Sequence, residues 1–267
     1  MSYKYSGIDI SKWQVPDKMN WEQIAKDHKF VIIRACYGVK SDWAFDLHFK
    51  AARENHVLVG AYIFYRQSQG WQEQFEAFKG ELDRVGFGED DILPVVDLEW
   101  NEKYDGEVDP AKFNTDAKAL VEKLAETYGG CILYLAPGFY QILGKPEWML
   151  QYPWWIAHFG VTQPWCPWKS WIIWQYTGEG RTAGYSGQAI DLNHADEMPP
   201  VVDLISDVED HLIPDLTDRE AYEDVESIVY EPEDPPEPPT LNAPLARVSL
   251  FQRLLAWVRL WILSHKN

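Results

Sequence analysis

Short apolar runs recur between residues 6 and 193, and they restrict the fold more than any other feature of the sequence. Most of them are rich in Val, Ile, Tyr and Trp, and several are apolar throughout rather than alternating with polar residues. Strands that are buried on both faces read in this way, as in a parallel sheet covered by helices. The eight predicted strands are 6–11, 30–38, 57–66, 92–100, 131–137, 153–159, 171–177 and 188–193.

The segments between the early runs have helical character, whereas the later ones do not. Helices are predicted at 20–28, 44–55, 71–84 and 110–128, and the last begins with an Asp109-Pro110 capping signal. After Pro153 the connections become short and rich in Trp, Pro and Gly. The pattern predicts an α/β fold, an irregular eight-stranded TIM-like closed parallel barrel whose last third is loop-rich.

Charge divides the chain into three parts. The whole sequence has 42 acidic residues against 24 Lys and Arg, for a net charge of −18. Residues 1–202 carry −9, residues 203–239 carry −13 and residues 240–267 carry +4. We therefore predict a barrel domain at 1–202, an acidic Pro-rich linker at 203–246 and a basic amphipathic helix at 247–267. The acidic balance argues against nucleic acid as a partner, because phosphate binding needs a basic face.

The C-terminal segment 247–266 places its apolar residues on one helical face. Arg253 and Arg259 interrupt the apolar sequence, which favours a helix lying in a membrane interface over one that spans it. Trp257 and Trp261 beside these bases are typical of anchors on anionic lipid. The alternative is that this helix packs on the barrel or on another subunit.

Two carboxylates at the end of a buried strand are the sharpest chemical signal. Asp97 and Glu99 are two positions apart, so on a strand they face the same side. Burial and mutual repulsion are expected to raise the pKa of one, giving a protonated acid beside an anion. In a parallel barrel these strand ends form the active-site face. The alternative is a structural ion pair with Arg34 or Arg66.

Two further acids are expected at the same rim. Asp9 lies late in the first predicted strand and Asp191 late in the eighth, and these strands are neighbours in a closed barrel. Taken alone, an aspartate at such a position is more often a turn or cap residue. An acidic pocket can also bind a divalent metal. No His stands beside these acids and no strong metal motif is present, so we expect neither a metal nor a cofactor.

Aromatic residues accompany the acids near the strand ends. Flat rings with polar tips stack on sugar faces, while carboxylates accept hydrogen bonds from sugar hydroxyls. This combination favours a carbohydrate ligand, although about half of such rings are expected to belong to the core. The candidate substrate-binding residues are Tyr62, Tyr65, Trp100, Tyr134, Trp155, Trp174 and Tyr176.

Several of these motifs together resemble the family-25 glycoside hydrolases, muramidases of the Chalaropsis type. They are the opening Gly7-Ile-Asp9-Ile-Ser11-Lys-Trp13-Gln14, Val96-Asp97-Leu-Glu99, Trp174-Gln175-Tyr176 and Asp191-Leu-Asn193. The resemblance covers about residues 5–198 and implies an irregular eight-stranded barrel with five helices. It also implies hydrolysis of the β-1,4 bond between N-acetylmuramic acid and N-acetylglucosamine. One departure is Ile63, where many members of the family have His.

The resemblance also implies roles for the four acids. The proton donor falls on Glu99, the aspartate that orients the substrate acetamido group on Asp97, and the flanking aspartates on Asp9 and Asp191. Bacterial peptidoglycan is the implied substrate.

We expect a monomeric phage endolysin that causes bacterial lysis. The first residues lack the basic and apolar regions of a signal peptide, so we expect synthesis in the host bacterial cytoplasm and action on the cell wall after release. Two alternatives remain open. One is a glycan-binding module with a membrane-binding tail, and the other is a bacterial autolysin or antibacterial effector with the same chemistry.

Overall fold

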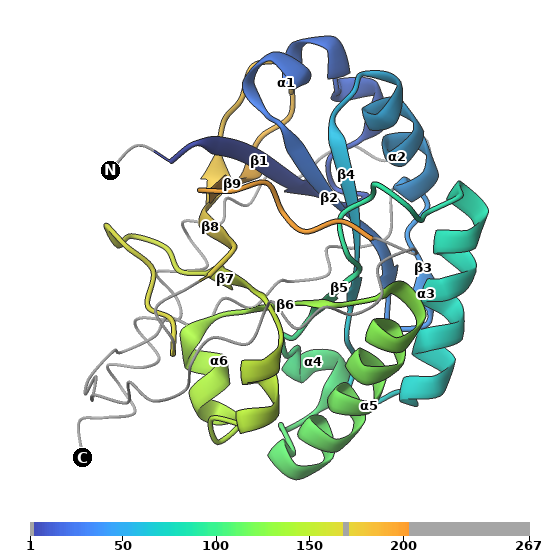
Figure 1. The fold of residues 1–267 in the computed structure, drawn as a ribbon, viewed down its shortest axis with the longest axis vertical. Coiled ribbons are helices and arrows are strands. Elements are labelled where there is room, and N and C mark those ends of the chain that lie inside the picture. Colours follow the sequence, from blue (N-terminus) through green and yellow to red (C-terminus); the bar gives the residue numbers. More distant parts are fainter. Residues whose placement is uncertain (1–2, 168–170, 203–267) are drawn as a thin grey trace, which may run out of the picture. The chain divides into compact units, whose positions relative to one another are not determined.

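A computed structural model describes residues 3–167 and 171–202 of the chain, and these residues form a barrel of strands with helices outside it (Figure 1). The predicted linker 203–246 and helix 247–267 lie outside the described residues. The strands are β1 (Tyr5–Ile10), β2 (Phe30–Tyr37), β3 (Lys40–Ser41), β4 (Leu58–Phe64), β5 (Val95–Asp97), β6 (Ile132–Leu135), β7 (Trp154–Ala157), β8 (Ile173–Gly180) and β9 (Ile190–Ala195).

The eight longer strands close into a barrel in the order β1-β9-β8-β7-β6-β5-β4-β2, with β2 pairing back to β1. The short strand β3 only extends β2 as a hairpin, which turns at Gly38 with a φ of 57°. The predicted closed α/β barrel with a loop-rich last third is thus confirmed. The prediction that every strand is parallel was wrong, because β9 runs antiparallel to both β1 and β8.

Four α-helices match the predicted positions, two short ones (α4 and α6) were not predicted, and together they cover the first two thirds of the barrel (Figure 1). The α-helices are α1 (Trp21–Asp27), α2 (Phe45–Glu54), α3 (Trp71–Val85), α4 (Glu102–Asp105), α5 (Pro110–Tyr128) and α6 (Pro137–Ile142), and the 3₁₀ helices are η1 (Pro16–Lys18) and η2 (Glu147–Gln151). The capping signal of α5 works as predicted, since the Asp109 carboxylate accepts hydrogen bonds from the backbone N–H groups of Ala111 and Lys112. In the described residues no helix follows η2, and none is long and apolar enough to cross a membrane.

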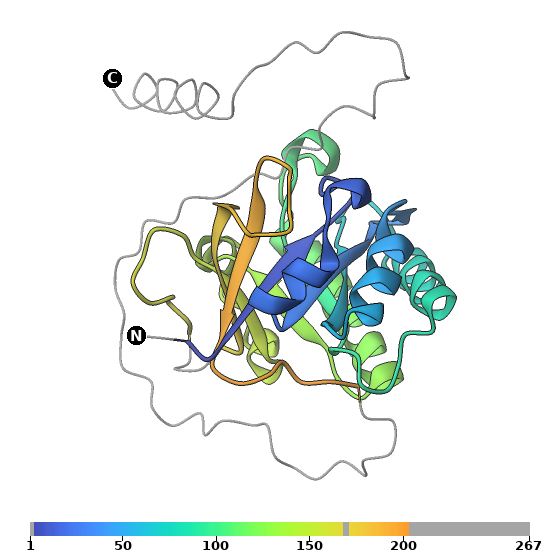
Figure 2. The ribbon, with the colours of Figure 1, turned by 90° about the horizontal axis from the view of Figure 1, so that it is seen from above.

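Two layers of side chains bury the strands, one inside the barrel and one between barrel and helices. Strand β2 shows why the strands read as continuous apolar runs, since all of its residues except Tyr37 are buried. The long hairpin of β8 and β9 (orange) lies away from α2 and α3 (Figure 2). The parallel strands end at one rim of the barrel, and the buried polar residues Asp9 and Asp97 lie near these strand ends.

Candidate active site

Strand pairing places Asp9 and Asp191 side by side at this rim. Asp9 is the fifth residue of β1, and its register partner on β9 is Asp191. Asp191 lies at the start of β9, not late in the strand as the sequence predicted. Because β9 is also antiparallel, its first residues lie where the parallel strands end. The early position of Asp191 in β9 and the antiparallel direction of β9 compensate for each other. Asp9 and Asp191 therefore lie side by side, as predicted.

A hydrogen-bond network surrounds the buried Asp9. Its Oδ2 accepts hydrogen bonds from Gln175 Nε2 at 2.9 Å and from Asn193 Nδ2 at 2.8 Å. Burial raises the pKa of Asp9 to about 6, against the lowering effect of these bonds and of one with Asp191. Burial, followed by the charge of Asp9, raises the pKa of Asp191 well above its usual range. The hydrogen bond between the two carboxyl groups lowers the pKa of Asp9 and raises that of Asp191, so the shared proton belongs to Asp191.

Asp97 and Glu99 complete the acidic cluster at the end of β5. Burial raises the pKa of Glu99 to about 8, a hydrogen bond with Tyr134 lowers it and the charge of Asp9 raises it again. Burial also raises the pKa of Asp97 well above its usual range. The negative charges of Glu99 and Asp9 raise this pKa further, whereas the positive charge of Arg34 lowers it. Glu99 is nevertheless only half-buried, so it can be reached from the rim. A carboxyl group that stays protonated at neutral pH and is accessible is a candidate general acid.

Asp97 carries an unsatisfied oxygen. Its side chain is buried, and among the described residues no hydrogen-bond donor reaches Oδ1. A buried acceptor without a donor is costly, so such groups are uncommon in folded proteins. This oxygen therefore marks a position at which a donor group of a ligand would be stabilised.

The two arginines that the sequence offered as partners for these acids form other ion pairs. Arg34 Nε contacts Asp42 Oδ2 at 3.0 Å, and Arg66 Nε contacts Asp105 Oδ2 at 2.7 Å. Arg34 still acts on the cluster, because its charge lowers the pKa of Asp97. The residues described include no group of three or more His, Cys, Asp and Glu arranged to hold a metal ion.

Three of the seven predicted aromatic residues line the barrel interior with the acids. The rings of Tyr134 and Trp155 are 4.5 Å apart between centroids, and those of Tyr62 and Trp155 are 6.4 Å apart. Trp155 Nε1 donates a hydrogen bond to Asn193 Oδ1 at 2.8 Å. The charges of Asp9, Asp97 and Asp191 all act on the hydroxyl of Tyr62, which places this residue beside the acids.

Three other aromatic residues face away from the acids. Because side chains alternate along a strand, Trp174 and Tyr176 lie on the outer face of β8, opposite to Gln175. There the Tyr176 ring stacks on His194 at 4.0 Å and Trp174 lies 5.9 Å from the same ring. Tyr65 packs against Phe113 of α5 at 4.9 Å, in the layer between barrel and helix. The structure therefore does not bring these three residues to the candidate substrate site.

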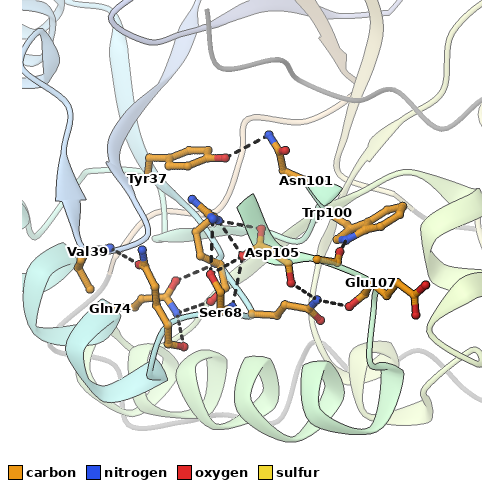
Figure 3. A network of polar contacts seen from close by, with 12 residues as sticks. Tyr37, Val39, Ser68, Gln74, Trp100, Asn101, Asp105 and Glu107 are labelled. Atoms are coloured by element: carbon orange, nitrogen blue, oxygen red, sulfur yellow. Dashed lines mark hydrogen bonds and ion pairs between the residues drawn. The ribbon is translucent and has the colours of Figure 1, made fainter. Parts of the chain in front are cut away.

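Trp100, the seventh predicted residue, lies next to Glu99 in a segment held by polar contacts (Figure 3). Its Nε1 donates a hydrogen bond to the carbonyl oxygen of Gly106 at 2.7 Å, just after α4. Asp105 of this helix accepts from Arg66 Nε with both carboxylate oxygens, at 2.9 and 2.7 Å. Ser68 Oγ also donates to Asp105, at 2.7 Å. These contacts fasten the segment that carries Glu99 and Trp100 to the loop after β4.

Gln175 and Asn193 were not predicted as site residues, although both lie within the sequence motifs that contain Trp174 and Asp191. Their signal was available, because each is an amide within a buried strand, and a buried amide needs partners. Gln175 is 4% exposed and Asn193 is fully buried. The partner that both amides share is the Asp9 carboxylate.

Comparisons with known proteins identify the family of this chain. The family model described as "Glycosyl hydrolases family 25" matches residues 8–185. The uncharacterized protein YegX of Escherichia coli is 30% identical over 199 residues, which are 72% of this chain and 70% of that protein. Lysozyme M1 of Streptomyces globisporus is 29% identical over 203 residues, which are 70% of this chain and 66% of that lysozyme.

Solved structures show the same fold. A family 25 glycosyl hydrolase from Bacillus anthracis aligns with a TM-score of 0.64 at 28% identity, covering 72% of this chain and 89% of that chain. The bacterial lysozyme of Streptomyces coelicolor aligns with a TM-score of 0.65 at 24% identity, covering 74% and 94%. This chain therefore belongs to family 25 of the glycosyl hydrolases, and it is a glycoside hydrolase of the lysozyme, or muramidase, class.

Proposed function

We propose that this enzyme cleaves the β-1,4 bond between N-acetylmuramic acid and N-acetylglucosamine in bacterial peptidoglycan. The proposal depends on one observation: Glu99 is only half-buried, and burial raises its pKa to about 8. At neutral pH this group holds a proton at the rim of the barrel, where it can be donated to a glycosidic oxygen. Tyr62, Tyr134 and Trp155 supply the aromatic surroundings that sugar rings favour.

The unsatisfied oxygen of Asp97 supports a role for the substrate acetamido group. In this mechanism Asp97 Oδ1 accepts a hydrogen bond from the acetamido N–H. The acetamido oxygen, aligned in this way, attacks the anomeric carbon while Glu99 gives its proton to the departing oxygen. Water then opens the cyclic intermediate and the anomeric configuration is retained, as in other substrate-assisted glycosidases. The alternative route is inversion, in which Asp97 activates a water molecule directly.

Analysis of the products tests both the bond and the stereochemistry. Purified peptidoglycan is digested with the full chain, reduced with borohydride and hydrolysed, so that the new reducing sugar appears as an alcohol. The proposal predicts that the alcohol of muramic acid is found. It also predicts that proton NMR shows the β-anomer in the first product formed. The alcohol of glucosamine, or release of peptides alone, would contradict the bond assignment. An initial α-anomer would favour inversion, and binding without any hydrolysis would favour a glycan-binding module.

We further propose that the enzyme acts as an endolysin, and that residues 247–266 bind anionic lipid. The support is in the sequence, where Trp257 and Trp261 accompany Arg253 and Arg259 in one amphipathic segment. The enzyme would be made in the host bacterial cytoplasm and would reach the cell wall once the inner membrane is breached.

Deletion of residues 240–267 tests the lipid proposal. Hydrolysis of isolated peptidoglycan should stay unchanged, while sedimentation with vesicles of anionic lipid should fall. Vesicles of zwitterionic lipid serve as the control for charge. If the full and shortened chains sediment equally, or if hydrolysis also collapses, the segment has a structural role instead.

A further inference from the structure

Phe159 lies at the rim of the barrel, just after the end of β7. Strands β5, β6 and β7 are parallel, so the residues that follow β7 lie at the same rim as Glu99. The preceding residue, His158, is fixed by β8, because its N–H donates to the Gln175 carbonyl oxygen at 3.1 Å and its own carbonyl oxygen accepts from Trp174 Nε1 at 2.8 Å. The Phe159 side chain is nevertheless 36% exposed. A large apolar ring is therefore held in a defined place where a ligand can reach it.

Gly178 on β8 brings this ring close to one of the four acids. A Cβ atom at Gly178 would lie 3.8 Å from Cε2 of Phe159 and 3.3 Å from Oδ1 of Asp191. The ring and the carboxyl group thus lie close to the same point, at which the glycine contributes no side chain. Asp191 is half-buried, so it can be reached from the rim. Phe159 therefore lies beside the acidic cluster, to which Asp191 belongs through its pairing with Asp9.

An aromatic ring beside a carboxyl group matches the two kinds of surface that a sugar presents. The C–H groups on the face of a sugar ring are apolar and pack on aromatic rings, while hydroxyl and acetamido N–H groups donate hydrogen bonds to carboxyl oxygens. We propose that Phe159 is a substrate-binding residue whose ring packs on a sugar unit that also donates a hydrogen bond to Asp191 Oδ1. This inference rests on the proposed function of the enzyme as a hydrolase of the peptidoglycan glycan.

The proposed contact lies away from the group that donates the proton. Phe159 follows β7, and Gly178 and Asp191 belong to β8 and β9, whereas Glu99 follows β5, which β6 separates from β7. The ring of Phe159 has no group that can transfer a proton, so it can contribute binding only. An interaction that is equally strong in the bound substrate and in the transition state lowers KM and leaves kcat unchanged. Loss of the ring should therefore appear in KM.

The test compares Phe159→Ala and Phe159→Tyr with the wild-type full chain in the hydrolysis of soluble peptidoglycan fragments. Phe159→Ala should raise KM roughly 5–30-fold and leave kcat within about twofold. Phe159→Tyr keeps the ring, so KM should stay within about threefold of the wild type. Val161→Ala is the matched control, because it shortens an apolar side chain that is also 36% exposed and follows in the same segment. Its KM should not change.

A second readout does not depend on activity. Each change is combined with Glu99→Gln, and calorimetric titration measures the affinity for soluble peptidoglycan fragments and for glycan strands from which an amidase has removed the stem peptides. Phe159→Ala should weaken binding to both by a similar factor. A loss of affinity that disappears with the stem peptides would overturn the assignment to a sugar. Wild-type affinity and KM in Phe159→Ala, with or without a lower Tm, would overturn the inference altogether. If the wild-type chain does not cleave peptidoglycan, the proposed function fails, and the binding comparison still tests Phe159 separately.

Discussion

Replacing Asp105 with asparagine tests whether the ion pair with Arg66 holds the segment that carries Glu99. Asp105 Oδ1 accepts hydrogen bonds from Arg66 Nε, from the backbone N–H of Ser68 at 3.2 Å and from its hydroxyl. The side chains of Asp105 and Arg66 are only 2% and 8% exposed. Asparagine keeps the shape, but it removes the charge and turns an N–H group toward donors. Arg66 is then left buried without its counter-ion.

The expected cost follows from that burial. Removing one partner of a buried ion pair destabilises a protein by about 3–5 kcal/mol, out of a total stability of about 5–15 kcal/mol. For a domain of this size we expect a loss of roughly 6–20 °C in Tm. Activity should fall as well, since displacement of a catalytic group by about 1 Å can cost about 10²-fold in rate.

Urea denaturation and peptidoglycan hydrolysis measure both effects. Asp83→Asn serves as the control, because the Lys79–Asp83 pair lies on the surface and should contribute less than about 1 kcal/mol. The double variant Arg66→Met/Asp105→Leu should regain much of the stability, since it buries no unpaired charge. A midpoint for Asp105→Asn equal to that of the wild type would refute the reasoning.

Three further predictions concern the acids and the rings. Glu99 must be protonated to act as the general acid, so kcat/KM should fall above a pH of about 8, and a rate that stays flat from neutral pH through that range would contradict the assignment. Glu99 binds its proton more tightly in the folded state, so its burial lowers stability as pH rises from about 4.5 towards 8; Glu99→Gln should therefore raise Tm at pH 8 by a few degrees and leave it unchanged at pH 4, as calorimetry can show. Trp155→Phe should lower the rate of hydrolysis, because Asn193 Oδ1 loses the hydrogen bond from Trp155 Nε1. Tyr176→Phe, on the outer face of β8, should leave that rate within about twofold of the wild type.

The positions of the strands could be predicted because burial on both faces leaves a continuous apolar run. The direction of β9 could have been inferred as well. Only residues 181–189 separate it from β8, and a parallel crossover needs a dozen residues or more. The apolar pattern itself does not distinguish the two strand directions.

Whether an aromatic residue lies beside the acids depends on which face of its strand it occupies. Trp174, Gln175 and Tyr176 are consecutive on one strand, so the two rings must share one face and the amide must take the other. Nearness to a strand end does not distinguish the two faces. The pairing of Arg66 with Asp105 could not be predicted, because it depends on how two loops distant in sequence meet in space.

The central claim is that Glu99 donates the proton that breaks the glycosidic bond. The most direct measurement is the rate at which Glu99→Gln hydrolyses purified peptidoglycan, compared with Glu102→Gln three residues along, an exposed glutamate at the start of α4. The account predicts that Glu99→Gln folds like the wild type and loses at least about 10²–10⁴-fold in rate, while Glu102→Gln stays within about twofold. A folded Glu99→Gln enzyme with a rate near that of the wild type would contradict it.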